Sequence, residues 1–124
     1  MAHLKTDRRA RLVPRIKIWL EIDGHYAFGF GVSEMLRAID KTGSIKQAAA
    51  DLGKSYRYVW GRVKDAEKTL GRQLVETHIG GKDAHRSCLT AEARRFVADF
   101  QDIRRRMVQS VQDEFARRRG WTLG

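Results

Sequence analysis

The chain has 124 residues, and its 25 Lys and Arg against 15 Asp and Glu give a formal net charge of +10 and a pI near 10.4. Such a pI is typical of nucleic-acid-binding domains, and the 42% hydrophobic content is enough for a packed core. The length fits one domain, which disfavours a multidomain enzyme. The single cysteine and the lack of a signal pattern disfavour a secreted scaffold. No apolar run reaches the roughly 18 residues that a membrane span needs, which disfavours a membrane protein.

The first part of the chain is predicted to be a basic arm followed by a β-hairpin. Pro14 ends the arm, residues 1–14, which is rich in Lys and Arg. Apolar and polar residues then alternate over residues 16–22, which is the period of a half-buried strand. Asp23-Gly24 suits a tight turn, and the alternation over residues 26–30 predicts a short returning strand.

The apolar period next changes to 3.6, which predicts three helices in succession. The apolar face of the first covers residues 32–39, and this helix ends before Gly43. The second begins after Ser44 and ends before Gly53, and the third covers residues 55–70 with Ser55 as its N-cap. Serine is a preferred N-cap residue, and glycine is common just past a helix end.

The second half of the chain predicts a second hairpin and a long helix. Strand-like runs at residues 74–77 and 87–89 flank a glycine-containing, basic loop, so residues 77–87 form the predicted wing. Residues 90–119 form the predicted dimerisation segment, in which Thr90 is the cap. The helix itself, from Ala91 to Arg119, would be about 43 Å long at 1.5 Å per residue. The rest of the chain cannot cover an apolar stripe of this length, so we expect a second copy to do so. The predicted dimer contacts are Phe96, Phe100, Ile103, Met107 and Val111.

The two helices around Gly53 have the features of a helix-turn-helix unit. The short turn needs a residue that tolerates left-handed backbone, the crossing needs a small residue such as Ala49, and Val59 faces back to the first helix. An ordinary helical hairpin shares these features, but the preceding helix and the following basic hairpin favour a winged helix. We therefore expect a mainly α fold with a small β component: a winged helix-turn-helix over residues 15–89, then the dimerisation helix and a tail, residues 120–124.

The third helix is the predicted recognition helix. An α-helix fits the major groove, and an arginine there can donate two hydrogen bonds to guanine. Base-reading residues usually lie in the first turns of such a helix, which makes Arg57 the main candidate. A solvated charged face is the alternative for each position. The other predicted DNA contacts are Ser44, Gln47, Ser55, Tyr56, Tyr58, Arg62, Lys82 and Arg86.

Signs of catalysis or metal binding are sparse. His78, His85 and Cys88 could be drawn as a metal cluster, but they lack a recognised ligand spacing, and structural zinc normally takes four ligands. A Cys–His nucleophile would need an orienting third residue, which the sequence does not suggest. We therefore expect no enzyme, no cofactor and no metal.

The order and spacing of several short motifs resemble the N-terminal winged-helix domain of the molybdate-responsive ModE regulators and, more loosely, LysR-type DNA-binding domains. The resemblance covers residues 15–110 and implies a dimeric bacterial or archaeal transcription factor, with the N-terminal strand and the long helix at the dimer interface. The matching residues are Gly43-Ser44-Ile45, Gln47, Ala49, Asp51, Gly53, Ser55-Tyr56-Arg57, Trp60, Leu74-Val75-Glu76, Gly80-Gly81-Lys82 and Leu89-Thr90.

The chain departs from the ModE pattern in two places. ModE proteins bind it in C-terminal oxyanion-binding domains, and these 124 residues offer no such site. Thr77 also stands where the family usually has an arginine. The resemblance thus implies DNA binding and a link to molybdenum-related genes, with no molybdate site in this chain. An effector at the dimer interface, a separate effector-sensing protein and no effector at all stay open alternatives.

The leading hypothesis is a homodimeric transcriptional regulator that binds double-stranded DNA at the nucleoid in the cytoplasm, with no membrane partner. Two recognition helices would enter successive major grooves. A non-specific architectural DNA-binding protein is the alternative, because charge alone supports such binding. A third hypothesis is an adaptor whose winged helix binds protein.

Overall fold

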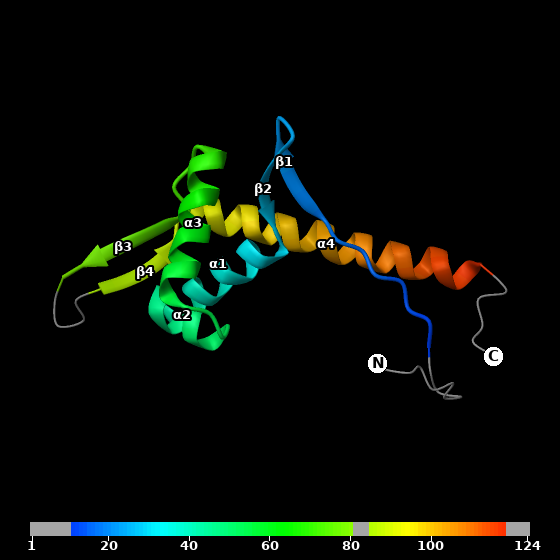
Figure 1. The fold of residues 1–124 in the computed structure, drawn as a ribbon, viewed down its shortest axis with the longest axis horizontal. Coiled ribbons are helices and arrows are strands. Elements are labelled where there is room, and N and C mark those ends of the chain that lie inside the picture. Colours follow the sequence, from blue (N-terminus) through cyan, green and yellow to red (C-terminus); the bar gives the residue numbers. More distant parts are fainter. Residues whose placement is uncertain (1–10, 81–84, 119–124) are drawn as a thin grey trace, which may run out of the picture. The chain divides into compact units, whose positions relative to one another are not determined.

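The computed structural model describes residues 11–80 and 85–118, in which Ile18–Asp102 form one compact unit and the flanking described residues belong to a second. Figure 1 shows helices as the main elements, with two small antiparallel hairpins. The mainly α fold class is therefore confirmed. The elements in chain order are β1 (Trp19–Ile22), β2 (His25–Gly29), α1 (Phe30–Thr42), α2 (Ile45–Asp51), α3 (Tyr56–Leu70), β3 (Val75–Ile79), β4 (His85–Leu89) and α4 (Ala91–Arg117).

The N-terminal hairpin is shorter than the sequence predicted. β1 begins at Trp19, and Phe30 starts α1 instead of extending β2. The turn has positive φ at both Asp23 and Gly24, as a tight two-residue hairpin turn requires. All four residues of β1 are exposed, so the expectation of a half-buried strand is wrong for the single chain. Leu20 and Ile22, which carry the apolar side of the alternation, are 36% and 41% exposed.

β2 delivers the central aromatic side chain of the core. Phe28 is fully buried and meets Phe96 and Phe100 of α4 edge to face, with ring centroids 4.8 and 5.1 Å apart. Phe100 is only 3% exposed, and Phe96 packs partly against the same core. This corrects the prediction that Phe100 contacts a second copy. Its side chain is buried within one chain, because β2 of the hairpin packs against α4. The compact unit accordingly extends past residue 89 and includes the first part of α4.

The helix-turn-helix has the predicted boundaries. The α2–α3 turn has Gly53 at φ +69°, and its backbone is closed by hydrogen bonds from the Gly53 and Lys54 amides to the Ala50 and Ala49 carbonyls, at 3.1 and 2.9 Å. Gly43, at φ +74°, ends α1 in the same left-handed conformation. The sequence predicted both turns because glycine adopts this backbone without a steric penalty.

The wing consists of β3 and β4, which pair from Val75↔Leu89 to Ile79↔His85. Figure 1 shows this hairpin projecting beside α2 and α3. Its base is fixed by Glu67 of α3, whose carboxylate accepts hydrogen bonds from the Leu74 and Val75 amides at 2.8 and 3.1 Å. Glu67 therefore connects the recognition helix to the wing, a role that the sequence did not reveal.

An ion pair joins α1 to α4. Arg94 donates to both carboxylate oxygens of Asp40 at 3.1 and 3.2 Å, and the Leu89 amide donates to the same carboxylate at 3.4 Å. The hydrogen bonds from Arg94 favour the ionised carboxyl, and they lower the pKa of Asp40 below its ordinary value.

Acidification is expected to remove the stabilisation that this pair gives. A carboxyl whose pKa is lower in the folded state stabilises the fold above the unfolded pKa, about 4, and loses that contribution as the pH falls. Between pH 6 and about pH 3, wild type should therefore lose more of its free energy of unfolding than the variant Asp40→Asn. Urea denaturation across this pH range measures the difference. Asp99→Asn, which changes an exposed aspartate on α4, is the control and should follow wild type. Parallel losses in wild type and Asp40→Asn would contradict the assignment.

Candidate nucleic-acid interface

The N-termini of α2 and α3 are both capped by serine. The Ser44 hydroxyl accepts a hydrogen bond from the Gln47 amide, and the Ser55 hydroxyl accepts one from the Tyr58 amide, each at 3.0 Å. The predicted capping roles are confirmed. Backbone amides at helix N-termini are common phosphate ligands in DNA complexes. Contacts of these two serines with phosphate stay predictions.

Loss of the α3 cap is expected to destabilise the fold modestly. Ser55→Ala leaves the Tyr58 amide without its side-chain acceptor, which typically costs about 0.5–2 kcal/mol of unfolding free energy. Chemical denaturation measures this loss. Ser110→Ala is a matched control, because Ser110 is an exposed serine inside α4. If the two variants were equally stable, the cap would not contribute.

The first turn of α3 presents an aromatic and basic outer surface. Tyr56, Arg57 and Tyr58 are all exposed. Arg57 forms no hydrogen bond or ion pair within the described parts of the chain, so its guanidinium is available to a ligand. Gln47 on α2 is exposed, but its amide nitrogen already donates to Asp51 at 2.8 Å.

Arg62 is more constrained than the sequence suggested. Its Nη1 donates to the Tyr58 hydroxyl at 3.0 Å, and its guanidinium lies 5.8 Å from the ring centroids of both Tyr58 and Tyr26. Tyr26 belongs to β2, so these contacts tie the recognition helix to the N-terminal hairpin. Lys54 approaches the Tyr58 ring at 5.6 Å. Arg62 therefore supports the position of Tyr58 within the free chain.

A groove of about 360 Å³ runs between α3 and the wing. Tyr56 and Trp60 line it from α3, and Thr77 lines it from β3. Trp60 is 44% exposed, and the Lys64 ammonium lies 5.7 Å from its ring centroid. Lys46 of α2 lines the same groove. Trp60, Lys46 and Lys64 extend the candidate interface beyond the predicted residues.

The sequence predicted two DNA contacts on the wing, Lys82 and Arg86. Lys82 lies outside the described residues. Arg86 is exposed in β4, and its side chain lies beside Gly43, where an added Cβ would be 3.6 Å from the guanidinium carbon. The Ser87 amide donates to the Gly43 carbonyl at 2.9 Å. β4 and the α1–α2 turn are therefore in direct contact.

The family model described as "Bacterial regulatory helix-turn-helix protein, lysR family" matches residues 33–94, which span α1, the helix-turn-helix, the wing and the start of α4. The chain belongs to this family. The predicted resemblance to LysR-type DNA-binding domains is thus confirmed.

Curated relatives of this LysR-family chain include two ModE proteins. It is 35% identical over 75 residues to the molybdenum transport protein ModE of Herbaspirillum seropedicae, which is 60% of this chain and 28% of that protein. It is 31% identical over 83 residues to the transcriptional regulator ModE of Haemophilus influenzae, which is 64% of this chain and 32% of that protein. The chain thus spans about a third or less of the length of these relatives.

Solved structures support the fold. A CbnR_DBD–DNA complex matches 72% of this LysR-family chain and 97% of the other chain, with a TM-score of 0.57 and 22% identity. ArgP from Mycobacterium tuberculosis matches 68% of this chain and 30% of the other, with a TM-score of 0.52 and 18% identity. Within residues 11–80 and 85–118, no helix has the length and apolarity needed to cross a bilayer.

Proposed function

We propose that the chain binds specific double-stranded DNA sequences as a homodimeric transcriptional regulator, with α3 in the major groove and the wing on the backbone or in the minor groove. The observation that carries the proposal is the start of α3. Arg57 projects unpaired from a capped helix directly after the helix-turn-helix turn, which is where base-reading residues lie in such units.

The side chains around Arg57 divide by role. Tyr56 and Trp60 offer apolar surface to bases or sugars, and Lys46 and Lys64 border the same groove with positive charge suited to phosphate. Ser44 and Ser55 cap the N-termini of α2 and α3, and the backbone amides at such termini are suited to binding phosphate. Tyr58 and Arg62 act as a pair, in which the arginine holds the tyrosine through its hydroxyl.

The far part of α4 supplies the proposed dimer surface. Ile103 and Met107 are 51% and 43% exposed, and they lie four residues apart on one helical face. Val111, four residues further, extends this stripe and is half-buried. Phe100 is excluded because it belongs to the core. An exposed apolar stripe on a helix is suited to packing against its symmetry mate.

The proposal also includes the control of molybdenum-related genes. It rests on the relatives named ModE and on the molybdenum-pterin-binding protein MopB of Rhodobacter capsulatus, which is 33% identical over 69 residues. These matches cover only a minor share of each relative, so the proposal concerns the genes controlled and includes no molybdate site in this chain.

Selection from a random duplex pool at about 150 mM salt tests the proposal, because non-specific affinity is then only about 10⁻⁴–10⁻⁶ M. We expect enrichment of an inverted repeat with half-sites about one helical turn apart. Enrichment of a single half-site would support sequence reading but contradict the dimer. Binding without enrichment would contradict the regulator and favour an architectural protein, which the net charge of +10 would also support.

A further inference from the structure

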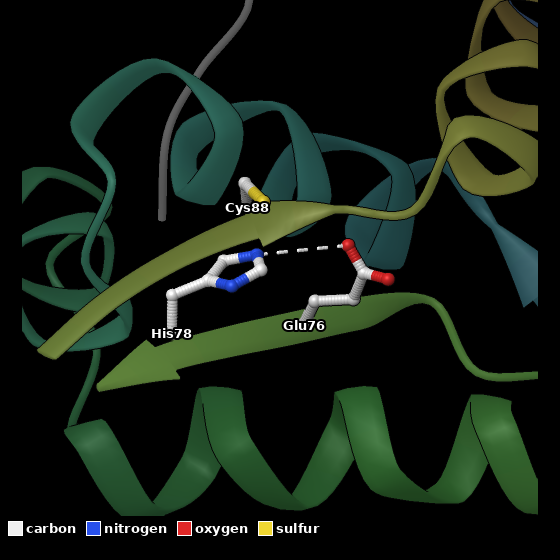
Figure 2. Close-up of side chains that lie close together, drawn as sticks. All are labelled: Glu76, His78 and Cys88. Carbon is white, nitrogen blue, oxygen red and sulfur yellow. Dashed lines mark ion pairs between the residues drawn. The ribbon is translucent and has the colours of Figure 1, made fainter. Parts of the chain in front are cut away.

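Three potential metal ligands of different chemistry lie together on the wing. Glu76, His78 and Cys88 each offer one ligand atom, and these atoms all lie within 4.8 Å of one another. Figure 2 shows the imidazole of His78 and the carboxylate of Glu76 rising from β3 toward Cys88 on β4. The His78 Nε2 is 3.8 Å from the nearest Glu76 oxygen.

The strand register explains why the three side chains meet. Glu76 pairs directly with Cys88 across the hairpin, so both project from the same face. His78 is two residues further along β3 and therefore shares that face. The sequence grouped Cys88 with His78 and His85, but it missed Glu76 because the register could not be read from spacing. The side chain of His85 lies outside the described residues.

The distances suit a tetrahedral ion after small side-chain rotations. Zinc bound at about 2.0–2.3 Å by nitrogen, oxygen and sulfur holds its ligand atoms about 3.3–3.6 Å apart. The observed separations, all within 4.8 Å, are close to this range. The three residues are exposed or half-buried, so a water molecule can reach the fourth position.

The chemistry of the three ligands restricts which metals fit. A thiolate and an imidazole favour zinc and its neighbours over Mg²⁺ or Ca²⁺, which prefer oxygen ligands. A carboxylate oxygen as the third ligand is also compatible with zinc.

We propose that Glu76, His78 and Cys88 form a binding site for a thiophilic divalent transition metal such as Zn²⁺. On binding, one carboxylate oxygen, one imidazole nitrogen and the sulfur replace water molecules of the hydrated ion, and the thiol proton leaves to solvent. The ion would join β3 to β4 and restrain the wing. Any consequence of that restraint for DNA binding rests on the proposed function, whereas the site itself does not.

Titration of the untagged, fully reduced 124-residue chain with Co²⁺ tests the site without DNA. Cys88 is the only cysteine, so a thiolate-to-Co²⁺ charge-transfer band can arise from this residue alone. We expect such a band, together with the intense visible bands of tetrahedral Co²⁺, saturating at one ion per chain. Zn²⁺ should abolish these bands, and excess Mg²⁺ should leave them unchanged.

Substitutions show whether the three residues act together. Cys88→Ser should remove the charge-transfer band, and His78→Gln and Glu76→Gln should each weaken Co²⁺ binding at least about 10-fold. His25→Gln, which changes an exposed histidine on β2, is the matched control and should bind as wild type. Far-UV circular dichroism checks that each variant is folded. Absence of the band in wild type, or binding unchanged by His78→Gln and Glu76→Gln, would overturn the proposal.

Discussion

Replacing Arg57 with alanine is expected to raise the Kd for the selected operator by roughly 5- to 150-fold, which corresponds to about 1–3 kcal/mol. The guanidinium is exposed and unpaired within the described residues, so its removal breaks no hydrogen bond or ion pair described in the free protein. A base-reading arginine can make two hydrogen bonds to guanine. The preference for guanine at one position of each half-site should therefore relax.

Fluorescence anisotropy with the selected duplex and with a scrambled duplex separates base reading from charge. Arg57→Ala should weaken operator binding more than scrambled-duplex binding. Arg37→Ala removes the same charge from α1, where Arg37 lies in a groove with Asp40 and Gln101, and it should preserve the preference between the two duplexes. Equal losses on both duplexes with Arg57→Ala would show that this side chain contacts phosphate instead.

Local chemistry explains what the sequence could predict. Ser44 and Ser55 cap their helices, and Gly43 and Gly53 take left-handed backbone, because each of these features depends on a residue and its immediate neighbours. The recognition helix follows from these signals, since an apolar 3.6 period and a cap define both its start and its buried face. This is why the described α3 begins directly after Ser55, as expected.

Contacts between distant segments explain what the sequence could not predict. Arg62 meets Tyr26, and Glu67 accepts hydrogen bonds from the residues entering β3, through pairings that only the folded chain brings together. Phe100 shows the same limit. Its place in the apolar stripe of α4 is the same whether a second copy or the chain's own β2 covers it, and only the packing of Phe28 decides between them.

The largest loss of stability is expected for Phe28→Ala, at about 3–5 kcal/mol of unfolding free energy. The ring is fully buried and contacts Phe96 and Phe100 edge to face, so its removal leaves a cavity and deletes both aromatic contacts. Domains of this size are commonly stable by about 5–15 kcal/mol. The variant should therefore unfold at a much lower urea concentration.

Urea denaturation at a fixed protein concentration measures this effect, and Tyr26→Ala is the matched control on the same strand. Tyr26 is exposed and its ring faces Arg62, so its removal should cost no more than about 1 kcal/mol. A smaller loss for Phe28→Ala than for Tyr26→Ala would mean that β2 does not pack on α4. In that case Phe96 and Phe100 would return to the proposed dimer surface, because a second copy would have to cover them.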